Sequence, residues 1–139
     1  MKRLTLLFLL AFGYPAFAQK KNKDINYYYY SAKQEPTFIA YLKAKKEFDE
    51  KKVDFKLPKS EDAVKEIEAN KAQILKNEKS YADFLSKHGM KNAGEYANLW
   101  FKQLNALKTF SRKNPEFSSL SAKERQDIID KWYYSGEFK

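Results

Sequence analysis

The chain has 139 residues, a net charge of +9, no cysteine and one histidine. The lack of cysteine excludes disulfides and thiol catalysis, and a single histidine is too few for a typical structural zinc site. With 4 glycines, the chain also has no glycine-rich loop of the kind that holds phosphates or dinucleotides. We therefore expect one ordinary domain with its own core, and no cofactor or metal.

Residues 1–18 have the pattern of a cleavable secretory signal peptide. A charged start, an apolar run and a small-residue cleavage motif follow one another at Lys2-Arg3, residues 4–12 and residues 16–18. The alternative is an uncleaved membrane anchor, but the apolar run has about nine residues, whereas a spanning helix takes roughly 20. We expect an exported protein of bacterial type, periplasmic or secreted, with no transmembrane segment after cleavage.

Residues 19–34 form a basic tail that contains four consecutive tyrosines, Tyr27 to Tyr30. Apolar residues show no helical spacing here, and tyrosine is common in extended chain. Side chains alternate along an extended segment, so two tyrosines would lie on the protein and two would face water. We predict an extended, tyrosine-rich arm in front of a helical domain that spans residues 35–139.

Apolar residues spaced three and four apart predict a first helix over residues 36–52. Residues 53–58 then alternate apolar and polar, which indicates an extended connector. A second helix is predicted from the N-cap Ser60 to Gly89, about 28 residues long. Its weakly apolar middle favours a kink or an exposed stretch.

The third helix is predicted from Asn92 to Lys113, with Asn92 and Glu95 as reciprocal caps. Its apolar arc is wider than a single stripe, which indicates the core helix. A short fourth helix begins at a second capping box, Ser121 with Glu124. The predicted fold is all-α, an antiparallel bundle of three long helices and a shorter C-terminal helix, preceded by the tyrosine-rich arm.

Candidate catalytic groups are few. His88 lies at a predicted helix end, where a histidine commonly caps carbonyls, so we favour a structural role for it. Acidic residues on the second and fourth helices are typical of first turns and solvated faces. An enzyme therefore stays the second hypothesis, a carboxylate-dependent hydrolase of an envelope polymer, which needs two carboxylates in one cleft. Its candidates are Glu61, Asp62, Glu66, Glu68, Glu124, Asp127 and Asp130.

Two basic zones, the tail and the end of the third helix, are candidates for contact with an anionic surface or polymer. Their residues are Lys20, Lys21, Lys23, Lys108, Arg112 and Lys113. Cations at a helix C-terminus are stabilising without any ligand, and the tail lysines are too few for a convincing polyanion-binding arm. Specific nucleic-acid binding is not expected, because arginine, the better phosphate ligand, is scarce.

Aromatic residues make up 17% of the chain, more than a small helical bundle easily buries. Because tyrosine and tryptophan are enriched where proteins meet, we predict a partner-binding patch rimmed by lysines. Its residues are Tyr27, Tyr28, Tyr29, Tyr30, Trp132, Tyr133 and Tyr134. The favoured function is an exported, non-enzymatic binding protein, such as an inhibitor, adaptor or chaperone-like factor, whose partner is another envelope or extracellular protein. Complete burial of both segments would remove the patch.

Overall fold

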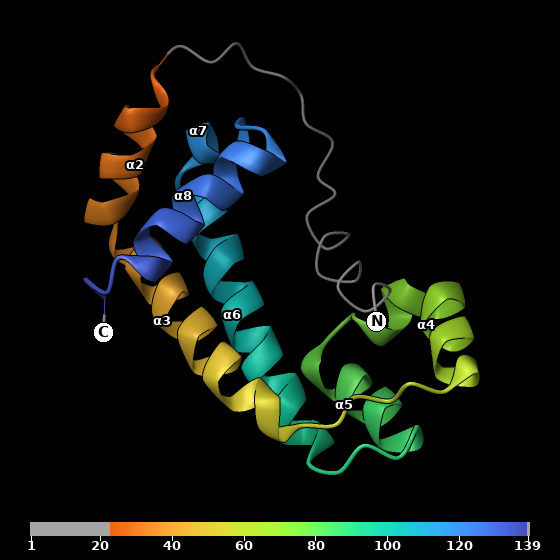
Figure 1. Cartoon of the computed structure of the whole chain (residues 1–139). Helices are drawn as coiled ribbons and strands as arrows, with labels where there is room; N and C mark the ends of the chain where they lie inside the picture. Colours follow the sequence, from red (N-terminus) through yellow and green to blue (C-terminus); the bar gives the residue numbers. More distant parts are fainter. Residues whose placement is uncertain (1–22, 139) are drawn as a thin grey trace.

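The computed structural model describes residues 23–138, and every regular element in this range is helical. In chain order the elements are α2 (Ile25–Gln34), α3 (Pro36–Lys51), the 3-10 turn η1 (Lys52–Asp54), α4 (Glu61–Ile74), α5 (Glu78–Lys87), α6 (Ala93–Lys113), α7 (Pro115–Ser118) and α8 (Ala122–Tyr134). Helices α3 and α6 run side by side, with α2 and α8 towards one end and α4 and α5 towards the other (Figure 1). The all-α prediction is confirmed for these residues, and the predicted signal peptide lies outside them.

The extended conformation predicted for the four tyrosines is wrong, because they lie in helix α2. Asp24 begins this helix, since its side chain accepts a hydrogen bond from the backbone N–H of Asn26 at 3.2 Å. Tyr28 and Ala32, one turn apart, are buried in a cluster with residues of α3 and α8. Burial of that helical face outweighs the modest preference of tyrosine for extended chain.

The single second helix predicted between Ser60 and Gly89 is also wrong. Helix α4 ends at Ile74, and α5 begins after Asn77, whose side chain accepts a hydrogen bond from the backbone N–H of Ser80 at 2.8 Å. The polar middle of the segment offers little apolar surface to hold a continuous helix. The two predicted ends are confirmed, because Ser60 caps α4 and Gly89 has a φ of +84°.

The capping box predicted for the last helix is confirmed. Ser121 Oγ accepts from the backbone N–H of Glu124 at 3.1 Å, and the Glu124 carboxylate accepts from the backbone N–H of Ser121 at 3.0 Å. The cap predicted at Asn92 is wrong, because its side chain makes no capping bond and its φ is +56°. Side chains that cap a helix N-terminus normally project from extended backbone, which Asn92 does not have.

The short helix α7 was not predicted.

The core consists of two clusters arranged along α6. One includes Phe48 and Trp100 with residues of α4 and α5, and the other includes Phe38 and Phe110 with residues of α2 and α8. Gln103 lies on α6 between the residues of the two clusters and is 2% exposed. Neither polar atom of its side-chain amide has a hydrogen-bond partner among the described residues. A buried, unpaired amide costs about 1 to 3 kcal/mol.

Replacing Gln103 by Met is therefore expected to stabilise the protein. Methionine keeps the length of the side chain and removes both unpaired polar atoms, so the free energy of unfolding should rise by about 1 to 2 kcal/mol. Urea denaturation followed by far-UV circular dichroism measures the change. The companion variant Gln103→Glu should be less stable than the wild type, because it introduces a charge at the same buried position. A loss of stability in Gln103→Met would contradict the claim that the unpaired Gln103 amide destabilises the fold.

Candidate functional site

The two aromatic segments singled out in the sequence lie side by side. Helix α2 packs against α8, as Figure 1 shows. The indole Nε1–H of Trp132 donates a hydrogen bond to the backbone carbonyl of Tyr29 at 2.8 Å, and the ring centroids of Trp132 and Tyr30 are 6.2 Å apart. An ion pair of 2.5 Å between Lys33 and Glu137 joins the end of α2 to the residues that follow α8.

The predicted patch residues divide into buried and exposed side chains. Tyr28 and Trp132 are 6% and 4% exposed, so they face the core and hold the surface in place without forming part of it. Tyr29 and Tyr133 are half-buried. Only part of the predicted patch is therefore accessible to a partner.

Three of the predicted residues are strongly exposed. Tyr27 and Tyr30 of α2 are 46% and 57% exposed, and Tyr134 at the end of α8 is 78% exposed. Across residues 23–138 one further large hydrophobic side chain is exposed to this degree, Val53 at 77%. The exposed aromatic surface of the described chain is thus concentrated in the two segments predicted to bind a partner. We call Tyr27, Tyr30 and Tyr134 the exposed tyrosines.

The ammonium group of Lys131 lies over the rings at the α2–α8 contact. Its Nζ is 4.6 Å from the ring centroid of Tyr29, 5.5 Å from that of Trp132 and 5.8 Å from that of Tyr30. Cations are attracted to the faces of aromatic rings at such distances. Lys131 is therefore in direct contact with aromatic residues of both α2 and α8.

The first turn of α2 has a second contact between lysine and tyrosine. Lys23 Nζ is 4.1 Å from the ring centroid of Tyr27 and 3.2 Å from a carboxylate oxygen of Glu116 in α7. The hydrogen bond between Lys23 and Tyr27 lowers the pKa of the Tyr27 hydroxyl and raises the pKa of Lys23, to which Glu116 also contributes. These contacts place the exposed ring of Tyr27 beside α7.

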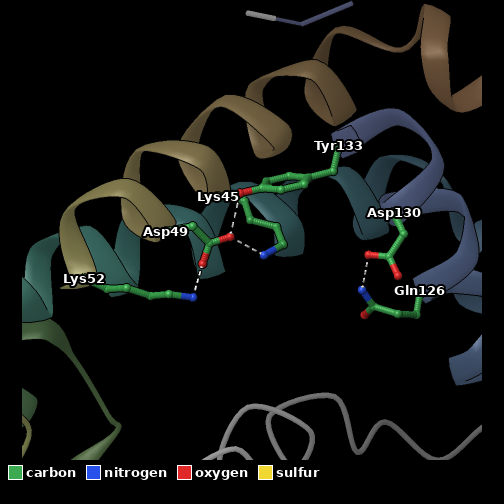
Figure 2. Close-up of polar contacts among 6 residues, drawn as sticks. All are labelled: Lys45, Asp49, Lys52, Gln126, Asp130 and Tyr133. Carbon is green, nitrogen blue, oxygen red and sulfur yellow. Dashed lines mark hydrogen bonds and ion pairs between the residues drawn. The ribbon is translucent and has the colours of Figure 1, made fainter. Parts of the chain in front are cut away.

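Tyr133 contacts α3. Its hydroxyl donates to Asp49 Oδ2 at 3.0 Å, Lys45 Nζ lies 2.6 Å from the same oxygen, and Lys52 pairs with the other oxygen (Figure 2). Burial, together with the Asp49 acceptor, raises the pKa of Tyr133 to about 12. Burial would raise the pKa of Asp49, but the three donors outweigh it and hold that pKa below its ordinary value. This network fastens α8 to α3.

The acidic residues proposed for a hydrolase have ordinary partners. Figure 2 shows Asp130 accepting a hydrogen bond from Gln126 at 2.8 Å, one turn earlier on α8. Asp127 pairs with Lys123 at 2.8 Å on the same helix. Among residues 23–138 there is no group of three or more histidine or acidic side chains that could hold a metal ion. These contacts are typical of a solvated helix face.

His88 connects two helices. Its Nε2 lies 2.8 Å from Glu66 Oε2 of α4, and Lys87 Nζ lies 2.8 Å from the same oxygen. Hydrogen bonds from Lys87 and His88 lower the pKa of Glu66. The imidazole also packs on the ring of Phe84, with centroids 4.8 Å apart. These contacts join the C-terminal end of α5 to α4.

Of the lysines in the predicted basic tail that were proposed for an anionic surface, Lys23 alone lies within the described residues. The ion pair of Lys23 with Glu116 places the start of α2 beside α7, which follows directly after the basic end of α6. The basic side chains at that end are all exposed: Lys108, Arg112 and Lys113. The tail residues Lys20 and Lys21 lie outside the described residues.

Sequence reasoning did not identify Lys131 or Asp49 as part of these contacts. Neither residue belongs to a motif or to one of the two basic zones in the sequence. The nearest signal was the position of Lys131 directly before Trp132. That signal becomes informative only once α2 is known to be a helix packed on α8.

Comparisons with protein-family models, curated proteins and solved structures found no match. Within residues 23–138, no helix is both long enough and apolar enough to cross a membrane. A function is therefore inferred from the side chains described above.

Proposed function

We propose that this chain is an exported helical bundle that acts by binding another protein, as an inhibitor, adaptor or chaperone-like factor does. The observation that supports this proposal is the exposure of Tyr27, Tyr30 and Tyr134 to solvent. Tyrosine contributes a large apolar area and a polar hydroxyl, and it is enriched among the residues that dominate binding energy. The partner is another envelope or extracellular protein.

The α2–α8 contact makes the exposed tyrosines suitable for binding. Helix α2 is held by the Trp132 hydrogen bond and by the burial of Tyr28 and Ala32. Tyr27 and Tyr30, three residues apart, are neighbours on the surface of this helix. A surface that is ordered before binding loses less conformational entropy when the partner docks.

A second candidate is contact with an anionic surface or polymer. The observation that favours it is the exposure of Lys108, Arg112 and Lys113 at the end of α6, where none of the three forms an ion pair with a described residue. Such contact would weaken with added salt, because screening reduces attraction between exposed charges. The hydrolase alternative gains no comparable support, because five of its seven carboxylates are engaged in a helix cap, an ion pair or a hydrogen bond within the described residues: Glu61, Glu66, Glu124, Asp127 and Asp130.

Site-specific photo-crosslinking tests the protein-binding proposal in the full chain. Tyr30 or Tyr134 is replaced by p-benzoylphenylalanine, the chain is produced in its own cells, and adducts are identified by mass spectrometry after irradiation. We expect a discrete protein adduct from each position. Val53 is the matched control, because it is as exposed as Tyr134 but lies outside the two segments. The absence of adducts at both tyrosine positions, or identical adducts at position 53, would overturn the proposal.

A further inference from the structure

Five described lysines lie over aromatic rings, and four of them form an ion pair with a carboxylate. Lys23 pairs with Glu116, Lys33 with Glu137, and both Lys45 and Lys52 with Asp49. Lys131 is the exception, because it forms no ion pair with any residue in the range 23–138. Of the five, Lys131 is therefore the lysine without a carboxylate partner among the described residues.

The position of this ammonium group is set by three rings. Its Nζ lies within 5.8 Å of the ring centroids of Tyr29, Trp132 and Tyr30. Attraction between the ammonium group and the ring faces restrains an otherwise flexible side chain. One of the three rings belongs to Tyr30, which is 57% exposed. An ordered cation and an exposed aromatic ring are thus neighbours on the same surface.

We propose that Lys131 is the charge anchor of this surface and binds a carboxylate in an acidic peptide segment of the partner. This inference rests on the proposed protein-binding function. The ammonium group has three donors and lacks an internal acceptor, so a partner carboxylate completes its contacts. Tyr27 and Tyr30 pack against an apolar side chain next to that carboxylate. Charge complementarity of this kind selects one partner over others.

A peptide fits this surface better than a polyanion or a lipid membrane does. Binding to polyanions and anionic membranes depends on several uncompensated cations, each of which adds a similar increment. Around the α2–α8 contact, Lys23 and Lys33 form ion pairs with carboxylates, whereas Lys131 forms none with a described residue. A single ordered cation beside exposed tyrosines matches a single carboxylate beside an apolar side chain.

Selection from a random dodecapeptide phage library on the immobilised, purified full chain tests this proposal. The wild-type chain is expected to enrich peptides in which Asp or Glu lies close to an aromatic or aliphatic residue. Lys131→Arg should keep this preference, because it keeps the charge and its contact with the rings. Lys131→Glu should enrich peptides with Lys or Arg instead. A synthetic peptide selected on the wild type should bind Lys131→Glu at least about tenfold more weakly, since like charges then face each other.

Two control variants make the outcomes distinguishable. Lys108→Glu reverses an exposed charge on α6. If this variant lost as much binding as Lys131→Glu, general charge attraction would explain the result, and the proposed role of Lys131 would be wrong. Tyr30→Ser removes an exposed ring. If peptides depend on Tyr30 but show no acidic preference, the anchor is wrong and the proposed function stands. If the wild type enriches no peptide beyond those enriched by Tyr30→Ser, both proposals are contradicted.

Discussion

Raising the pH from about 9 to about 12 is expected to unfold the protein, because three buried tyrosines resist ionisation. Burial raises the pKa of Tyr96 to about 12 and raises the pKa values of Tyr41 and Tyr81 further. A tyrosine in the unfolded chain has a pKa of about 10. The folded-state values are thus the higher ones, so their stabilisation is complete below about pH 10 and is lost as the pH rises through them.

The expected loss is comparable to the whole stability of a domain. At about pH 12 each of the three tyrosines disfavours the folded state by about 2 kcal/mol, which sums to on the order of 6 kcal/mol. Domains of this size are stable by about 5 to 15 kcal/mol. In an alkaline titration, the helical signal in far-UV circular dichroism should therefore fall together with the part of the tyrosinate absorbance that comes from the three buried tyrosines.

A conservative variant separates tyrosine ionisation from other alkaline effects. Tyr96→Phe keeps the buried ring and removes the ionisable hydroxyl, so the unfolding midpoint should move to higher pH. Tyr134→Phe is the matched control, because that ring is 78% exposed in the folded protein, and its midpoint should equal that of the wild type. A helical signal that persists unchanged well above pH 12 would show that ionisation of these tyrosines does not destabilise the fold.

Trp132→Ala is expected to lower the free energy of unfolding by about 3 to 5 kcal/mol, the usual cost of removing a large buried aromatic side chain. Trp132 is 4% exposed, and its indole N–H donates a hydrogen bond to the backbone carbonyl of Tyr29. Its loss should also release α2 from α8, which limited proteolysis within residues 25–34 would detect. Urea denaturation followed by circular dichroism gives the change in free energy.

Two further variants show whether this loss has the assigned cause. Trp132→Phe keeps an aromatic ring and removes the hydrogen bond, so it should cost about 1 kcal/mol for the bond in addition to a small packing term. Tyr134→Ala removes an exposed aromatic side chain of the same helix and should change stability by less than about 0.5 kcal/mol. If Trp132→Ala cost as little as Tyr134→Ala, the packing role assigned to the indole would be wrong.

Several features that depend on a few neighbouring residues were predicted well, although the cap at Asn92 was not. The cap at Ser60, the capping box at Ser121 and the stop at Gly89 all follow from local hydrogen bonding or local backbone geometry. The long core helix was predicted because its apolar residues repeat at helical spacing over many turns. Such signals are contained within one segment, so they need no knowledge of the rest of the chain.

Features that depend on contacts between distant segments were missed. The tyrosine segment is a helix because Tyr28 and Ala32 are buried in a cluster with residues of α3 and α8, and no pattern within residues 19–34 specifies those neighbours. For the second helix, the kink expected in its polar middle is confirmed by the non-helical torsions of Asn70, but its division into α4 and α5 was missed. The same holds for the candidate site. The composition showed an excess of aromatic residues, but which rings stay exposed depends on how α2 packs against the rest of the protein.

The sequence by itself determined that this is an all-α chain, with most helix ends set by local caps and stops, and that two aromatic segments exceed what the core needs. Only the tertiary structure decided that these segments meet, that Trp132 supports the surface from beneath, and that Tyr27, Tyr30 and Tyr134 stay exposed. The physical reason is the distance along the chain over which each interaction acts. Caps and periodicity act over one or two turns, whereas burial and ring contacts such as that of Lys131 with Tyr29 join residues about one hundred positions apart.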